Sequence, residues 1–223
     1  MPTEPCAAIW DLDGTLVDTA ELHFAAWERM AREMGRPFSR ADFAATFGRR
    51  NPEIIRFLFR REFTDDEILD IGEQKENYYR SAAEAGVQLL PGVRELLDGL
   101  HGRGVRQAVG SSAPRGNLDL ILRITGSRQY FDAIVGMEDT HRGKPDPEVF
   151  LVAAKKLGVP PARCIVFEDA VAGVEAAKAG GMKCVAVTFV GHHPEERLRA
   201  AGAERVVRSF TEVTADDVLA LVR

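Results

Sequence analysis

The chain has 223 residues, a formal net charge of −5 and 45% hydrophobic residues, which is enough apolar material for a sizeable core. Its mild acidic balance offers no basic surface for nucleic acid, and it has no apolar run of about 18 residues that would span a membrane. We therefore expect neither a nucleic-acid partner nor a membrane partner. The three cysteines are far apart, which argues against disulfides or a zinc site and favours free thiols in the cytoplasm.

The predicted elements begin with an apolar run at residues 6–10, which is typical of a buried strand. Two carboxylates, Asp11 and Asp13, follow it directly and lead into a Gly-Thr turn. Helical apolar spacing comes next, in residues 20–34, 40–46, 52–63 and 65–85. Thr64 and the acids after it have the pattern of a helix N-terminus. No strand pattern interrupts these helices, so residues 20–86 are predicted to form an all-helical block.

From about residue 87 the pattern alternates between strands and helices. Strands are predicted at residues 105–110, 133–135, 164–167 and 184–187. Helices are predicted at residues 93–100, 117–124, 147–157, 171–179, 195–200 and 215–221. This alternation is typical of a doubly wound parallel sheet. We therefore predict an α/β protein with a Rossmann-like three-layer core, residues 1–19 and 87–223, and an inserted all-helical cap domain, residues 20–86.

Four groups of polar residues lie near the ends of predicted strands. Three of them directly follow a strand, and the one around Lys144 opens the helix after the strand at 133–135. They are Asp11 with Asp13, Ser111 with Ser112, Lys144 between glycine and proline, and Glu168 with Asp169. The carboxyl ends of parallel strands meet at one edge of a sheet, so we expect these side chains to converge. Clustered carboxylates suit Mg²⁺, while a lysine, a serine and a helix start suit a phosphate. We expect Ser111 also to cap the helix that follows it.

In this arrangement the two N-terminal acids have separate expected roles. Asp11 is expected to attack phosphorus as a carboxylate nucleophile. Asp13 is expected to protonate the leaving oxygen and then to deprotonate the incoming water. Lys144 and the metal would offset the charge of the transferred group.

These motifs resemble those of the haloacid dehalogenase superfamily of phosphotransferases, in the same order and over nearly the whole chain. The segments around Lys144 and Glu168 resemble the branch that contains β-phosphoglucomutase and small-metabolite phosphatases. The resemblance implies an aspartyl-phosphate on Asp11, acid/base catalysis by Asp13, and a sheet of strand order 5-4-1-2-3. It also implies Mg²⁺ bound by Asp11, the Asp13 backbone carbonyl and Asp169, with Glu168 supporting the metal. Because Asp13 is present, phosphoryl transfer is favoured over dehalogenation.

The cap is expected to select the substrate. Candidate substrate-binding residues are Ser112, His23, Arg49, Asn51, Arg115 and Asn117. Thr19 and His23 match mutase residues that link closure of the cap to the acid/base. Asn51 stands where the mutase has an arginine for the distal phosphate, although Arg49 and Arg50 precede it. The mutase's later cap lysine falls at Gln74, with Lys75 beside it.

An amide does not replace a bidentate arginine, so we favour hydrolysis over a mutase reaction. The sequence thus predicts a cytoplasmic Mg²⁺-dependent phosphatase that acts on a small phosphomonoester, such as a sugar phosphate. We expect the protein to be a monomer or a weak homodimer. One alternative is a β-phosphoglucomutase-type phosphohexose mutase. Another is a non-catalytic sensor of phosphorylated metabolites, which would have no need of Asp13. His192 and His193 are interpreted as surface loop residues and not as a metal pair.

Overall fold

The computed structural model describes residues 5–59 and 61–222 and contains a six-stranded parallel sheet of order β3-β2-β1-β4-β5-β6. The strands are β1 (Ala7–Trp10), β2 (Arg106–Gly110), β3 (Ala133–Val135), β4 (Cys164–Glu168), β5 (Lys183–Val187) and β6 (Arg205–Val207). The predicted α/β class is confirmed, and the first five strands lie in the expected order. The prediction missed β6, a three-residue strand at the edge of the sheet.

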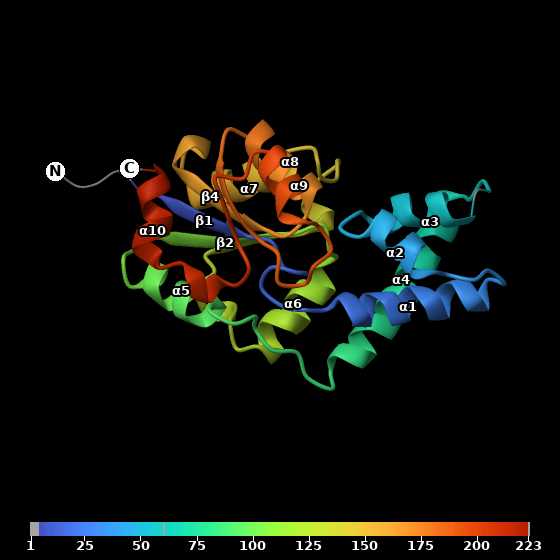
Figure 1. Cartoon of the computed structure of the whole chain (residues 1–223). Helices are drawn as coiled ribbons and strands as arrows, with labels where there is room; N and C mark the ends of the chain where they lie inside the picture. Colours follow the sequence, from blue (N-terminus) through green and yellow to red (C-terminus); the bar gives the residue numbers. More distant parts are fainter. Residues whose placement is uncertain (1–4, 60, 223) are drawn as a thin grey trace.

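Helices cover both faces of the sheet and make the expected three layers (Figure 1). One face carries α5 (Val93–His101), α6 (Arg115–Ile124) and α10 (Ala215–Leu219). The other face carries α7 (Glu148–Leu157), α8 (Val171–Ala179) and α9 (Glu195–Ala200). Neighbouring strand residues point to opposite faces, so Trp10 and Ile9 belong to different hydrophobic clusters. Short 3-10 helices lie at Arg128–Tyr130, Met137–Asp139, Pro161–Arg163, Phe210–Glu212 and Ala220–Val222.

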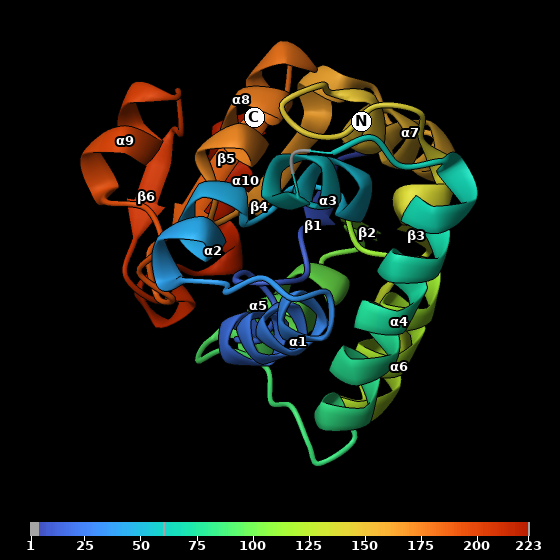
Figure 2. The ribbon, with the colours of Figure 1, turned by 90° about the vertical axis from the view of Figure 1, so that its right-hand side faces the viewer.

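Among the described residues, four helices lie between β1 and α5, and we call residues 20–83 the helical insertion. They are α1 (Ala20–Glu33), α2 (Arg40–Thr46), α3 (Asn51–Phe59) and α4 (Asp65–Ala83). They share a hydrophobic cluster of their own that contains Trp27, Phe43 and Ile55. The expected start of α4 is confirmed, because Thr64 and Glu67 form a reciprocal capping box. Figures 1 and 2 show the insertion facing the carboxyl edge of the sheet.

Two local expectations are wrong. The helix after β2 begins at Arg115 with Pro114 in the N-cap position, so Ser111 does not cap it; the Ser111 hydroxyl accepts the Ala113 N–H at 3.2 Å instead. His192 and His193, in the loop between β5 and α9, are partly buried, and His192 packs against the insertion. The His192 ring lies 4.1 Å from that of Phe47.

The cysteines agree with the prediction of free thiols, since Cys164 and Cys184 are buried without a disulfide and Cys6 is partly buried. Within residues 5–59 and 61–222, no helix has both the length and the apolar character needed to cross a membrane.

Candidate active site

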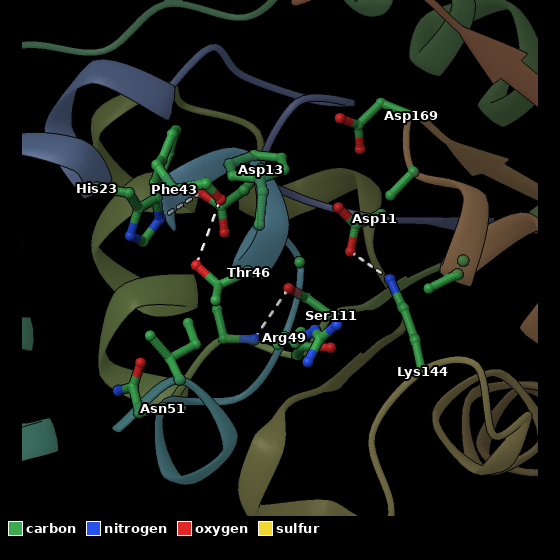
Figure 3. Close-up of a pocket in the computed structure, with 18 of the residues that line it drawn as sticks. Asp11, Asp13, His23, Phe43, Thr46, Arg49, Asn51, Ser111, Lys144 and Asp169 are labelled. Atoms are coloured by element: carbon green, nitrogen blue, oxygen red, sulfur yellow. Dashed lines mark hydrogen bonds and ion pairs between the residues drawn. The ribbon is translucent and has the colours of Figure 1, made fainter. Parts of the chain in front are cut away.

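The predicted catalytic side chains meet at the carboxyl edge of the sheet (Figure 3). Asp11 directly follows β1, and its backbone N–H donates to the Phe167 carbonyl at 3.0 Å. Ser111 directly follows β2, and its N–H donates to the Val135 carbonyl at 3.0 Å. The strand ladders therefore continue for one residue past the strands, which fixes the backbone that carries these side chains.

Lys144 enters the site from the loop before α7 and bridges two carboxylates. Its ammonium lies 2.6 Å from an oxygen of Asp11 and 2.6 Å from an oxygen of Glu168. Burial would lower the pKa of Lys144, but the two carboxylates outweigh burial and raise it. The second Glu168 oxygen accepts the N–H groups of Asp169 and Ala170 at 2.8 and 2.9 Å. This lysine is thus held charged beside the expected nucleophile.

Three carboxylates, those of Asp11, Glu168 and Asp169, have oxygens within 4.8 Å of one another. Burial and the neighbouring carboxylates raise the pKa of Asp169 well above its usual range. Burial also raises the pKa of Asp11 to about 7, despite the opposing effect of Lys144. The Asp169 Oδ2 atom is buried, and no hydrogen-bond partner for it exists among the described residues. One ammonium does not balance three buried carboxylates, so this oxygen-rich set fits a divalent cation such as Mg²⁺.

Two glycines provide the space that these carboxylates occupy. A Cβ on Gly14 would lie 2.2 Å from Asp169 Oδ2, and the Gly14 φ of +86° also disfavours a side chain. A Cβ on Gly173 would lie 1.8 Å from Glu168 Oε1. The Gly173 position therefore serves the carboxylate cluster as well as the close approach of α8 to the sheet.

The Asp13 side chain points away from the acidic cluster and toward the insertion (Figure 3). Its Oδ1 accepts the Thr19 hydroxyl at 2.5 Å and lies 3.1 Å from His23 Nε2. The Lys75 ammonium lies 2.8 Å from His23 Nδ1. An ammonium can only donate, so Nδ1 accepts and Nε2 donates its proton to Asp13. Burial would raise the pKa of Asp13, but His23 and Thr19 outweigh burial and lower it.

A buried polar network extends from this point through α4. The Glu76 carboxylate accepts from the Lys75 ammonium at 2.9 Å, the Asn51 amide at 2.8 Å and the Asn117 amide at 2.7 Å. Burial would raise the pKa of Glu76, but Lys75, His23 and the amides bring it to about 2. The Asn117 bond links the insertion to the core. The expected position of the cap lysine is also corrected, because Gln74 is exposed and Lys75 is buried.

The pocket lies between the insertion and the sheet edge and encloses about 740 Å³, including open solvent at its mouth. Of the candidate substrate-binding residues, it brings together Ser112, His23, Arg49 and Asn51. Arg115 and Asn117 do not line it. The Arg115 guanidinium donates to the Ile134 carbonyl at 3.1 Å and to Asp139 at 3.3 Å, away from the pocket.

Arg50 does not line the pocket but contacts the core. Its guanidinium donates to the Thr140 carbonyl at 3.1 Å, the Arg142 carbonyl at 2.7 Å and the Thr140 hydroxyl. These acceptors lie in the loop that leads directly to Lys144. Arg50 thus ties the insertion to the segment that carries Lys144.

The sequence reasoning missed several residues that line the pocket from the insertion: Trp27, Phe43, Thr46, Phe47, Ile54 and Glu76. For Glu76, the burial pattern of its helix would have indicated a place in the pocket. The buried positions of α4 are Ile68, Gly72, Lys75, Glu76, Tyr79 and Ala83, which all lie on one helical face. Two charged residues on an otherwise apolar face indicate a buried polar site.

Comparisons with known proteins agree with this geometry. The model of the haloacid dehalogenase-like hydrolase family matches residues 8–187. The chain is 31% identical to the phosphorylated carbohydrates phosphatase of Thermotoga maritima over 209 residues, which cover 91% of this chain and 94% of the relative. It is 33% identical to the β-phosphoglucomutase of Bacillus subtilis over 217 residues, covering 94% and 92%. The solved β-phosphoglucomutase of Clostridium difficile superposes with a TM-score of 0.88 at 28% identity, covering 98% and 97%. The chain therefore belongs to the haloacid dehalogenase-like hydrolase family, as its motifs predicted.

Proposed function

We propose that the protein is a Mg²⁺-dependent phosphatase that hydrolyses a small phosphomonoester, such as a sugar phosphate, through an aspartyl-phosphate on Asp11. One observation carries the proposal: two carboxylates, two residues apart, are held in different surroundings. Asp11 lies 2.6 Å from Lys144 inside the acidic cluster, whereas Asp13 is bonded to Thr19 and His23. A nucleophile and an acid/base need such separate environments. The relative named as a phosphorylated carbohydrates phosphatase supports the substrate class.

In the first half-reaction, an oxygen of Asp11 attacks phosphorus and the bond from phosphorus to the ester oxygen breaks. The proton of Asp13 passes to that oxygen, and the alcohol leaves. The Asp13 Oδ1 atom is occupied by Thr19 and His23, which leaves Oδ2 for this proton. The negative charge of a bound phosphate raises the pKa of Asp13, because like charges disfavour ionisation, and so supplies the acid form.

In the second half-reaction, the Asp13 carboxylate takes a proton from water as the water oxygen attacks phosphorus. The bond from phosphorus to Asp11 breaks, which releases inorganic phosphate and restores both side chains. Lys144 holds Asp11 and the phosphoryl oxygens, with the Ser111 hydroxyl beside them. Mg²⁺, held by Asp11, Asp169 and the Asp13 backbone carbonyl with support from Glu168, would neutralise charge on the phosphoryl group.

We also propose that residues 20–86 act as a cap over a core of residues 1–19 and 87–223. The insertion supplies half of the pocket wall, and Arg50 ties it to the loop that carries Lys144. A closed cap excludes bulk water from the phosphoryl group and strengthens the charge interactions around it. The free, mostly buried thiols support action in a reducing compartment such as the cytoplasm.

The test is a hydrolysis assay of the full-length protein on p-nitrophenyl phosphate and on a panel of sugar monophosphates. We expect phosphate release that requires Mg²⁺, stops on chelation and is lost in Asp11→Asn. The Asp13→Asn variant should lose more activity on sugar phosphates than on p-nitrophenyl phosphate, whose leaving group needs no proton. Full activity of Asp11→Asn would contradict the assignment of the nucleophile.

A phosphohexose mutase is the second candidate, because Lys75 lies in the pocket beside His23, as the mutase's cap lysine would. A mutase would convert β-glucose 1-phosphate to glucose 6-phosphate with a bisphosphate primer. Coupled detection of glucose 6-phosphate, compared with phosphate release from the same sample, separates the two reactions. Faster formation of glucose 6-phosphate than of phosphate would favour the mutase.

A further inference from the structure

We propose that the pocket wall formed by Asn51 and Glu76 admits a substrate with one phosphate and an uncharged, hydroxyl-bearing remainder, and that Glu76 rejects a second phosphate. The inference rests on the proposed phosphatase function and narrows its substrate class. Both residues belong to the insertion and line the same pocket as Asp11. They therefore face the part of the substrate that is not being transferred.

Glu76 is a fixed and buried negative charge in this wall. The residue is 3% exposed, and three donors hold its carboxylate at distances of 2.7 to 2.9 Å. One of these donors is the Lys75 ammonium, so the buried cation nearest to this wall is already engaged. A second phosphate placed here would meet a desolvated carboxylate whose neighbouring ammonium is already engaged, which is costly.

The remaining hydrogen-bonding capacity of the wall suits hydroxyl groups. A carboxylate has about four acceptor positions, and three donors occupy those of Glu76, so one position is left. Asn51 directs its amide N–H at Glu76, which leaves its carbonyl oxygen as a further acceptor. Acceptors bind hydroxyl protons and repel phosphate oxygens. Trp27, Phe43 and Ile54 supply apolar contact for a carbon skeleton.

Arg49 is the competing feature, because it is exposed and lines the mouth of the pocket. Within the described ranges the Arg49 side chain makes no hydrogen bond or ion pair, and its guanidinium lies 6.0 Å from the Phe57 ring. If Arg49 held a second phosphate, a bisphosphate would be a good substrate and loss of Arg49 would abolish that activity. A wall controlled by Glu76 predicts poor bisphosphate hydrolysis, whereas a phosphate site at Arg49 predicts good bisphosphate hydrolysis, so one assay separates them.

The experiment compares kcat/KM for fructose 1-phosphate and fructose 1,6-bisphosphate in the full-length protein with Mg²⁺. We expect the wild type to prefer the monophosphate by about 100-fold, because like charges repel in the pocket. Glu76→Gln should reduce this preference at least about tenfold. Effects of the substitution on catalysis itself cancel in the ratio. Glu73→Gln, an exposed position on the same helix, is the matched control and should keep the wild-type ratio.

Equal activity of the wild type on both compounds, or an unchanged ratio in Glu76→Gln, would overturn the inference. Selective loss of bisphosphate activity in Arg49→Gln would overturn it in favour of Arg49. Binding of both compounds to Asp11→Asn and to the double variant Asp11→Asn with Glu76→Gln, measured by calorimetry, gives the same comparison without turnover. Absence of hydrolysis with p-nitrophenyl phosphate and all sugar phosphates would refute the phosphatase proposal instead, while the calorimetric ratio would still decide the role of Glu76.

Discussion

Replacing Glu76 by glutamine should destabilise the protein in a pH-dependent way. The wild-type carboxylate has a pKa of about 2 in the folded chain against an ordinary value of 4.5, because Lys75, His23 and two amides outweigh the effect of burial. This difference corresponds to a contribution on the order of 3 kcal/mol to the free energy of unfolding at neutral pH. Glutamine keeps the shape of the side chain but leaves Lys75 facing a neutral partner.

The sign of the pH dependence follows from the lowered pKa. A group with a depressed folded pKa stabilises the protein above its unfolded pKa and loses this effect as the pH falls toward its folded pKa. About 2 kcal/mol of the contribution should therefore disappear between pH 7 and pH 3.

The assay is urea unfolding of wild type, Glu76→Gln and the exposed control Glu73→Gln at several pH values in this range. The stability gap between wild type and Glu76→Gln should narrow on acidification, while that of the control stays near zero. A gap that is the same at all pH values would refute the reasoning, because the loss would then be one of packing and not of charge.

The remaining predictions concern the acidic cluster and the contact between insertion and core. Gly173→Ala should reduce phosphatase activity by about 100-fold, because its Cβ would lie 1.8 Å from Glu168 Oε1 and displace the carboxylate that holds Lys144. Gly180→Ala, with its nearest contact at 3.4 Å, is the control, and equal activity of the two variants would contradict this view. Asp169→Asn should raise the melting temperature of the metal-free protein by relieving charge repulsion. For the wild type, Mg²⁺ at 100 times its Kd should raise the melting temperature by about 5–10 °C, and Asp169→Asn should abolish this rise. If Mg²⁺ still raised the melting temperature of this variant, the metal would bind elsewhere. Arg50→Ala should lower kcat/KM by about tenfold through loss of charged hydrogen bonds to the loop before Lys144, whereas Arg56→Ala, at an exposed position on α3, should not. Equal losses in these two variants would argue against a specific role of Arg50.

The sequence predicted the sheet and the candidate site at its carboxyl edge because both depend on local signals. Apolar runs mark the strands, and a polar residue directly follows β1, β2 and β4, as in Trp10 to Asp11 and Gly110 to Ser111. Once the strands are parallel, their carboxyl ends must share an edge, so the convergence of Asp11, Lys144 and Asp169 needed no three-dimensional information. The starts of the helices in the insertion were likewise readable from period and capping, although α3 ends at Phe59 and not at residue 63 as predicted.

The pocket wall was less predictable, because it depends on how the insertion packs against the core. Glu76 meets Asn117 across 41 positions of sequence, and no local pattern relates two such residues. The burial of His192 against Phe47 arises in the same way. A one-residue error in a helix also turns a side chain by about 100°. That error placed the cap lysine at the exposed Gln74 in place of Lys75.

The most direct test of the division of labour between Asp11 and Asp13 is to trap the phosphorylated enzyme. Asp13→Asn should still accept a phosphoryl group from p-nitrophenyl phosphate, whose leaving group needs no proton, but should release it slowly for lack of a base. Acid quenching and peptide mass spectrometry should then find one phosphoryl group on Asp11 and none in Asp11→Asn. A phosphoryl group on another residue, or normal turnover of Asp11→Asn without any phosphorylated enzyme, would contradict the account.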